Sequence, residues 1–348
     1  MEQAIVIRAH AFNSNHRNMK VLTEKICRWS VRFVLAVATL GSIGLAHSQP
    51  APGSSPAAVS RIVMLGTAGG PLARADRSGI ATLIIVNGTN YLVDAGEGVV
   101  RQLSRIRVNA QDVRTIFFTH LHDDHTAGLP ALVGFAYSGR LPGPINLYGP
   151  PQTERLTRGL LDYLRVNTEL RMPGLDLPQP LDVLVFAHDE GPGVIYKDAN
   201  ITVTAVENTH YHQEPKEHKS YALRFDLPDR SVVMTGDTGP SEAVERLATG
   251  ADMLIAELAD VDGVVDELRR IGWWARMSEE GRRQFTFHLE SEHLTAEAVA
   301  QLAQRAGVRQ VVMTHVTFRA DNDYSAALKK VQAGFTGKAV VANDMDSF

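Results

Sequence analysis

Histidine and aspartate side chains are concentrated between residues 119 and 130, a segment that reads THLHDDHTAGLP. Three histidines and two aspartates stand in six consecutive positions: His120, His122, Asp123, Asp124 and His125. Imidazole and carboxylate groups are the ligands that a catalytic zinc ion favours. Because side chains two residues apart on an extended chain point the same way, His120 and His122 should face one point. Asp124 and His125 follow on the next turn and should face a second point.

Other residues with ligand chemistry stand alone, each directly after a predicted strand. They are Asp94 in VDAGEG, His210 in NTH, Asp237 in TGDTG and His315 in MTH. Strand ends release side chains from a sheet into a common space, which is where a site of this kind must lie. A lone histidine is more often a core residue, so these positions carry weight only together with the segment 120–125.

The elements that must position these residues are short strands and helices. Strands are expected at Ser60–Leu65, Ala81–Val86, Asn90–Asp94, Thr115–Thr119, Asn146–Tyr148, Val183–Phe186, Ile201–Asn208, Ser220–Phe225, Ser231–Thr235, Met253–Glu257 and Gln310–Thr314. Helices are expected at Gly98–Ile106, Gln152–Val166, Ser241–Thr249 and Leu294–Ala306. The strands run in groups with helices between the groups, which favours sheets sandwiched between helical layers.

The HxHxDH pattern at residues 120–125 resembles the signature of the metallo-β-lactamase superfamily. The family's other motifs are matched in the correct order by Asp94, His210, Asp237 and His315. The resemblance covers about residues 60–345. It implies an α+β fold, a four-layer αββα sandwich formed by a single domain over residues 60–348, with a dinuclear metal site between the sheets.

The resemblance also implies a role for each of these residues. One metal would be held by His120, His122 and His210, the other by Asp124, His125 and His315, with Asp237 bridging both. Asp94 would accept the outer N–H of a ligand imidazole and so orient it. Two zinc ions are the expected cofactors, and manganese or iron stay open because His/Asp sites accept several metals. Two cations about 3.5–4 Å apart can clamp a hydroxide and polarise the substrate.

Two further segments resemble the ribonuclease Z-like branch of the superfamily, Leu65–Pro71 (LGTAGGP) and Asp94–Leu103 (DAGEGVVRQL). In that branch a histidine before the last motif serves as proton donor or charge stabiliser. The resemblance implies this role for His293, for which a plain helix-start residue is the alternative. The residues expected to take part in catalysis are therefore Asp94, Asp124 and His293.

The N-terminal residues 1–48 predict a secretory signal peptide. A basic flank precedes the apolar run Phe33–Leu45, and the small-x-small triplet Ala46-His47-Ser48 follows it. The run has 13 residues, too few to cross a bilayer comfortably. A start at Met19 would give the leader a normal length, and an uncleaved anchor is the alternative. Residues 49–59, rich in Pro, Ser, Gly and Ala, are expected to form a flexible linker.

Charge and cysteine content bear on partners and location. The formal net charge is −4 for the whole chain and −8 without residues 1–48, which also hold the single cysteine, Cys27. An acidic, thiol-free protein suits a periplasmic or secreted location.

Transfer-RNA-processing relatives carry an arm between the third-motif histidine and the bridging aspartate, but His210 and Asp237 are only 27 positions apart. We therefore expect a small anionic ester as substrate, no nucleic acid polymer, and no stable membrane insertion after cleavage. A homodimer is a state that the resemblance allows.

These expectations together predict an exported, dinuclear metal-dependent hydrolase that cleaves a phosphodiester or a sulfate ester by metal-activated hydroxide. The activity would be phosphodiesterase-like or arylsulfatase-like. Hydrolysis of a β-lactam, lactone or other carbonyl ester or amide is the alternative, and a non-catalytic metal-binding protein is a third hypothesis. Residues 261–290 are expected to form a mostly helical cover beside the site. Aromatic residues of this cover, such as Trp273 and Phe287, would line an apolar pocket or pack on the core.

Overall fold

The computed structural model describes residues 60–175, 179–211 and 217–348. The predicted signal peptide over 1–48 and linker over 49–59 lie outside the described residues. Among the helices of these ranges, none is both long and apolar enough to cross a membrane.

The first sheet has six strands in the order β1-β2-β3-β4-β5-β6. They are β1 (Ser60–Gly66), β2 (Ala81–Val86), β3 (Thr89–Val93), β4 (Val113–Phe117), β5 (Ile145–Gly149) and β6 (Val185–Asp189). The first three strands pair antiparallel, and β3 to β6 pair parallel. Asn87 and Gly88 join β2 to β3 with φ values of 50° and 78°, the left-handed conformation that a two-residue hairpin turn needs.

The second sheet has seven strands in the order β13-β12-β11-β10-β9-β8-β7. They are β7 (Gly193–Lys197), β8 (Thr202–Glu207), β9 (Tyr221–Asp226), β10 (Ser231–Met234), β11 (Met253–Leu258), β12 (Gln310–Val316) and β13 (Lys338–Val341). Strands β7 to β10 pair antiparallel, and β10 to β13 pair parallel. Strands β8, β10, β11 and β12 therefore all end at the same edge of this sheet.

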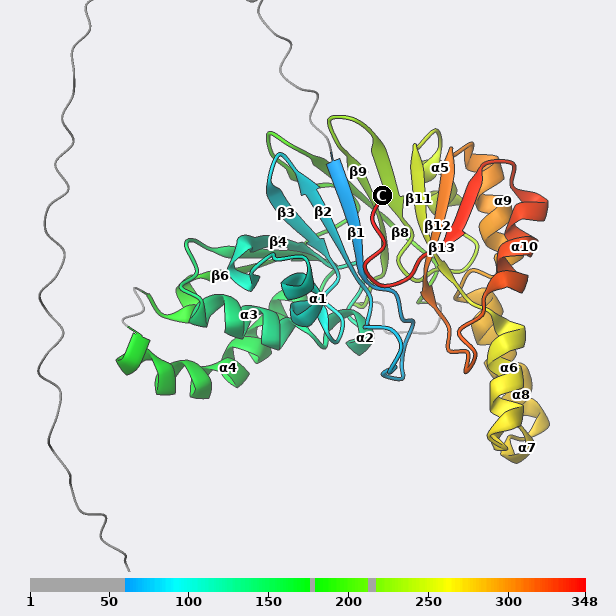
Figure 1. Cartoon of the computed structure of the whole chain (residues 1–348), viewed down its shortest axis with the longest axis horizontal. Coiled ribbons are helices and arrows are strands. Elements are labelled where there is room, and N and C mark those ends of the chain that lie inside the picture. The colour runs from blue at the N-terminus through cyan, green and yellow to red at the C-terminus, as the bar shows by residue number, and fades with distance from the viewer. Residues whose placement is uncertain (1–59, 176–178, 212–216) are drawn as a thin grey trace, which may run out of the picture. The chain divides into compact units, whose positions relative to one another are not determined.

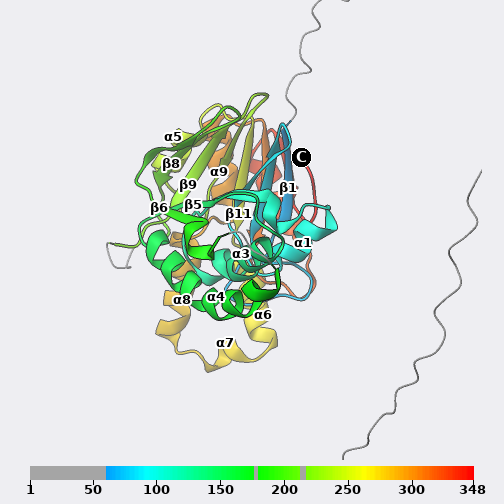
Figure 2. The same cartoon turned by 90° about the vertical axis from the view of Figure 1, so that its left-hand side faces the viewer.

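Helices cover the outer face of each sheet (Figures 1 and 2). The helices are α1 (Val99–Arg105), α2 (Asp123–Thr126), α3 (Leu129–Ser138), α4 (Thr153–Leu175), α5 (Glu242–Ala248), α6 (Val261–Arg270), α7 (Trp273–Arg276), α8 (Glu279–Ser291), α9 (Ala296–Ala306) and α10 (Ser325–Gly334), with 3₁₀ turns at Ala110–Asp112 and Leu181–Val183. One apolar cluster joins α1, α3 and α4 to the first sheet, and another joins α5, α9 and α10 to the second.

A third apolar cluster lies between the two sheets. It contains Ile84 and Phe117 from the first sheet and Leu223 and Ile255 from the second. Each sheet is thus buried on both faces, which explains why the strands read as nearly continuous apolar runs. The expected α+β, αββα sandwich is confirmed.

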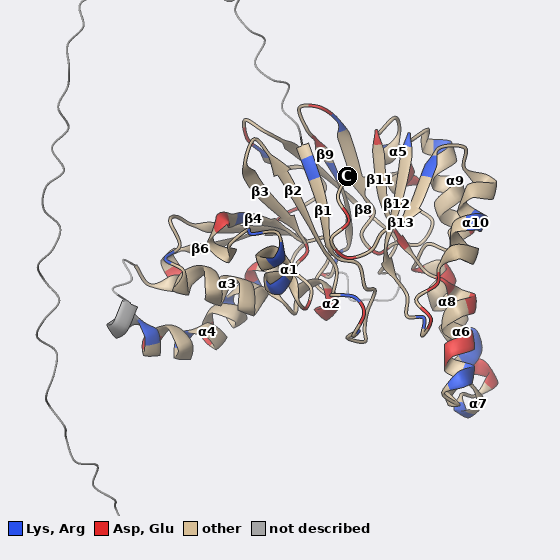
Figure 3. Ribbon diagram, viewed as in Figure 1, with Lys and Arg blue, Asp and Glu red and all other residues tan. Residues whose placement is uncertain are grey.

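Helices α6, α7 and α8 project away from the two sheets (Figure 1). Charged residues of both signs lie along them (Figure 3). Several pair within the helices, as Arg269 does with Asp266 and Arg283 with Glu279. Trp273 is 60% exposed and Phe287 is 62% exposed. The segment 261–290 is therefore a mainly solvated helical projection, and these two aromatic side chains do not pack on the core.

Candidate metal centre

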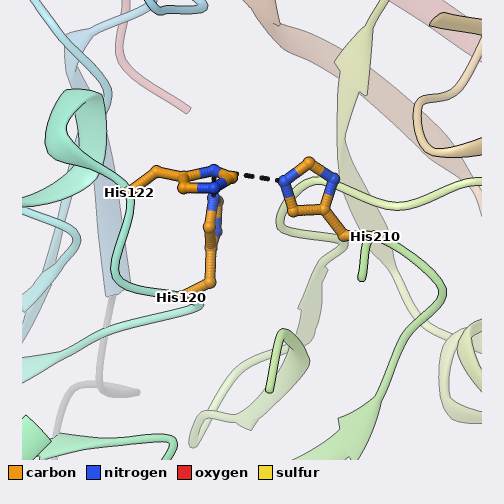
Figure 4. A group of neighbouring side chains, drawn as sticks. All are labelled: His120, His122 and His210. Carbon is orange, nitrogen blue, oxygen red and sulfur yellow. Dashed lines mark hydrogen bonds between the residues drawn. The ribbon is translucent and has the colours of Figure 1, made fainter. Parts of the chain in front are cut away.

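The first group of side chains that could hold a metal ion consists of His120, His122 and His210 (Figure 4). His122 Nδ1 lies 3.0 Å from His120 Nε2 and 3.2 Å from His210 Nε2. His120 and His122 follow β4 of the first sheet, whereas His210 follows β8 of the second. The ring nitrogens of three histidines from two sheets therefore converge on one small volume.

The second group consists of Asp124, His125 and His315. Asp124 Oδ2 lies 3.0 Å from His315 Nε2 and 3.7 Å from His125 Nε2. Asp124 and His125 belong to α2, the single turn of helix after β4, and His315 lies near the end of β12. The backbone N–H of Gly70 also donates to Asp124 Oδ2 at 2.8 Å, so the loop after β1 helps to hold this carboxylate.

Asp237, which follows β10, lies between the two groups. Its Oδ2 is 3.9 Å from His120 Nε2 and 3.3 Å from His315 Nε2. Its Oδ1 is 3.4 Å from His125 Nε2. One buried carboxylate thus faces ligand atoms of both groups, the arrangement needed to bridge two cations.

Buried polar atoms in this centre test whether a metal fits it. His125 Nε2 and Asp237 Oδ1 are buried and have no hydrogen-bond partner among the described residues. Buried polar atoms are normally satisfied, so such atoms need another partner. Neutral imidazoles and carboxylates are zinc ligands. The donor set therefore fits metal ions at both groups, and it does not select zinc over manganese or iron.

Asp94, at the end of β3, holds one of these imidazoles from outside. Its Oδ1 accepts the backbone N–H of Thr119, and its Oδ2 accepts the Thr119 hydroxyl, both at 2.9 Å. The same Oδ2 lies 2.9 Å from His125 Nδ1. The Nδ1–H of His125 therefore points at Asp94, which leaves Nε2 aimed at Asp124 and Asp237.

The electrostatics of the imidazoles follow from burial and from these carboxylates. Burial lowers the pKa of His120 well below its usual range and that of His210 to about 3, which favours the neutral form that ligates metals. His125 is equally buried, but three carboxylates outweigh burial and raise its pKa. They are Asp94, Asp237 and Asp124.

His293 lies beside both groups and is held by Glu257, a carboxylate that is not among the site residues predicted from the sequence. His293 Nδ1 lies 2.6 Å from Glu257 Oε2, and the backbone N–H of Thr238 donates to Glu257 Oε1. Burial alone would lower the pKa of His293, but Glu257 raises it to about 9. The sequence does carry a signal for Glu257, because it is the only charged residue in the otherwise apolar strand MLIAEL.

A cavity of about 650 Å³ lies beside the centre, on the side of His122. Its walls come from the chain around α2, α3 and α4 and from Tyr211, and none of its lining residues belongs to the segment 261–290. The aromatic residues of the segment 261–290, which were expected to line an apolar pocket, therefore do not line this cavity.

Comparison with known proteins decides the family. The model of the β-lactamase superfamily domain matches residues 89–316, well over half of the chain. The chain belongs to the metallo-β-lactamase superfamily. The structure of the metallo-β-lactamase fold protein YhfI from Bacillus subtilis is similar to it in fold, with a TM-score of 0.61 at 19% identity over 83% of this chain and 98% of that one.

Within the superfamily, the chain has relatives named ribonuclease Z. One from Methanosarcina mazei is 28% identical over 82% of this chain and 96% of its own length. Another, from Mycobacterium avium strain 104, is 30% identical over 73% of this chain and 85% of its own length. The expectation that excluded a nucleic acid polymer is wrong, because these relatives are ribonucleases by name. Net charge and the short interval from His210 to Asp237 were too coarse to exclude that substrate class.

Proposed function

We propose that this superfamily member is a dinuclear metal-dependent phosphodiesterase that accepts RNA. The observation that carries the proposal is the His293–Glu257 pair beside two ligand groups that share Asp237. The ligand groups would hold two zinc ions, which supply an acidified water and neutralise charge on a bound oxyanion. The names of the ribonuclease Z relatives support RNA as a substrate.

The His293–Glu257 pair suits phosphate chemistry for a physical reason. Hydrolysis of a phosphodiester develops negative charge on the phosphoryl oxygens and on the leaving alkoxide. Nδ1 of His293 is engaged by Glu257, so Nε2 is the ring nitrogen that can donate to an oxygen. A proton donor at this place stabilises the charge that an alcohol leaving group gains. Asp94 contributes by holding His125, and Asp124 by contacting His315 within the second ligand group.

The test compares substrate classes with one preparation of the full chain. We expect the protein to release p-nitrophenol from bis(p-nitrophenyl) phosphate and to cleave an end-labelled RNA. A chelator should abolish both activities, and added zinc should restore them. Weak or no release is expected from p-nitrophenyl sulfate and from a chromogenic β-lactam. Faster turnover of the sulfate or the lactam, or activity that chelation does not affect, would overturn the proposal.

Neighbouring aspartates provide a matched control for the same assay. Asp124 contacts His315, whereas Asp123 is exposed and its Oδ1 accepts the N–H of Asp124. We expect Asp124→Asn to lose on the order of 100-fold or more in kcat/KM together with bound metal, as loss of a ligand implies. Asp123→Asn should keep both. Equal effects of the two substitutions would contradict the assignment of Asp124 to the ligand set.

Export is a separate proposal that rests on residues 1–48 alone. It is tested by expressing the full chain in a Gram-negative host and determining the N-terminus of the protein in each cell fraction. Periplasmic protein that begins near Gln49 supports export. Cytoplasmic protein with an intact N-terminus would overturn it.

A further inference from the structure

The cavity of about 650 Å³ beside the metal centre has no role in the chemistry described above. It shares His122 with the first ligand group. Tyr211 forms another common wall, since its ring centroid lies 5.3 Å from that of His122 and 5.9 Å from that of His120. A group bound in the cavity would therefore lie next to any substrate bound at the metal centre.

The longest wall of the cavity is one face of α4. The lining positions on and before this helix are Gln152, Arg155, Leu156, Gly159, Leu160 and Tyr163. Their spacing of three and four residues places them on the same side of the helix. Leu156 and Leu160 make this face apolar, and Tyr163 is 71% exposed. Gln152, Arg155 and His218 are polar members of the lining.

We propose that this cavity binds a nucleobase of the substrate, next to the phosphodiester that is cleaved. The proposal rests on the proposed function and names the substrate class more closely. Ligand pockets measure about 300–1,000 Å³ and combine apolar walls with a few polar groups, as this cavity does. Two tyrosines, Tyr163 and Tyr211, line the cavity. Aromatic side chains are the groups on which proteins stack a planar base. Gln152 and Arg155 supply an amide and a guanidinium group, which can form hydrogen bonds with a nucleobase. The other possible occupant of an apolar cavity, an acyl chain, has no polar atoms to bind these groups.

Gly159 allows the cavity to be filled without disturbing the fold. It lies within α4 and lines the cavity, and a Cβ atom built on it meets no atom within 4 Å. A side chain at this position therefore projects into open space. Glycine is also an unfavourable residue inside a helix, so replacing it should not cost stability. Gly159→Phe fills part of the cavity, and Gly159→Ala is the matched control that adds only a methyl group.

The experiment measures binding, so that it does not depend on turnover. The metal-loaded full chain is titrated by calorimetry with adenosine monophosphate, as the 3′ and 5′ isomers, and with methyl phosphate, which lacks the base. The wild-type protein should bind at least one nucleotide more tightly than methyl phosphate. Gly159→Phe should lower the affinity for that nucleotide about 10-fold, which is the scale of one stacked base, and leave the affinity for methyl phosphate unchanged. Gly159→Ala should change the affinity for neither ligand by more than about 2-fold.

Two arginines of α4 provide a second comparison. Arg155 lines the cavity, whereas Arg158 is exposed on another side of the helix and pairs with Glu154. Arg155→Gln should weaken nucleotide binding, and Arg158→Gln should not.

Three outcomes would overturn the proposal. The first is that Gly159→Phe leaves the affinity for the nucleotide unchanged, and the second is that it weakens the binding of methyl phosphate equally. The third is that dodecyl phosphate binds more tightly than the nucleotide and that Gly159→Phe abolishes this binding, which would assign the cavity to an acyl chain. A failure of the proposed function is distinct, because it would show as absent phosphodiester turnover while nucleotide affinity still depended on Gly159.

Discussion

The hydrogen bonds of single imidazoles determine which of their nitrogens face the metal centre. His125 Nδ1 lies against Asp94, and His210 Nδ1 lies 3.1 Å from the backbone carbonyl oxygen of Glu292. In each case the outer nitrogen has a protein partner, and Nε2 points toward the common volume. Such partners orient a ligand before a metal arrives, so less freedom is lost on binding.

His293 leads to a prediction that depends on the leaving group. If Nε2 donates a proton to the leaving oxygen, His293→Ala should slow cleavage of RNA, whose leaving group is a poor alkoxide, on the order of 10²–10⁴-fold. Cleavage of bis(p-nitrophenyl) phosphate should slow by less than about 10-fold, because p-nitrophenolate leaves without protonation. The measurement is kcat on both substrates for the wild type, His293→Ala and Glu257→Gln.

Metal content is the control for this prediction, because His293 also lies near His210 and Asp237 in a group that could hold a metal. Unchanged metal content in His293→Ala is expected. Loss of one metal equivalent would show that His293 acts as a ligand. Equal slowing of both substrates with unchanged metal content would contradict proton donation to the leaving group.

At the scale of elements, the centre is built where strands end. β3 leads to Asp94, β4 to His120, β8 to His210 and β10 to Asp237. Asp94 has a φ of 58° and His315 a φ of 45°, a left-handed conformation that side chains other than glycine adopt at a cost. Asp94 directly follows β3, and His315 lies where the pairing of β11 with β12 shifts register. Each of the two side chains makes contacts within the centre. Strained backbone of this kind concentrates at functional sites.

The start of α9 carries a stability prediction. Thr295, two residues after His293, is the N-cap residue of α9. Its hydroxyl accepts a hydrogen bond from the backbone N–H of Ala298. Thr295→Ala should lower the free energy of unfolding by about 1 kcal/mol, and Thr295→Ser should retain most of it. Urea unfolding of the chelated protein measures both variants. A Thr295→Ala protein as stable as the wild type would show that the cap contributes nothing.

At the scale of the whole molecule, the two sheets supply different parts of one centre. The segment 120–125 extends from the first sheet, and His210, Asp237 and His315 extend from the second. Metal ions bound between them would link two halves of the sandwich that are otherwise joined by apolar packing. Ligands that bind only the folded state stabilise it by mass action.

Metal removal should therefore lower thermal stability. At a free zinc concentration of about 100 times Kd, one site adds about 2.7 kcal/mol, which raises the Tm by roughly 4–5 °C for a domain of this size. Thermal unfolding with zinc and with chelator measures the difference. Asp124→Asn should show a smaller difference than Asp123→Asn. An unchanged Tm in a protein that demonstrably binds two metals would contradict a link between the sheets.

Much of this molecule could be predicted from short stretches of sequence. The strand before His120 and the hairpin at Asn87–Gly88 follow from local apolar patterns and turn chemistry, which need no knowledge of the rest of the chain. Other elements were missed or misjudged in length. Helix α10 and strand β13 were not predicted, and α4 continues to Leu175 beyond the expected end at Val166. Tertiary packing stabilises such elements where the local pattern is weak.

The sequence by itself determined the types of the candidate ligand side chains and their order along the chain, because residue chemistry and strand periodicity are local properties. Only the tertiary structure showed that Glu257 faces His293 and that α4 and Tyr211 line a cavity beside His122. These are relations between residues far apart in the sequence. They depend on the order of the strands and on how the layers pack, and no local pattern encodes either.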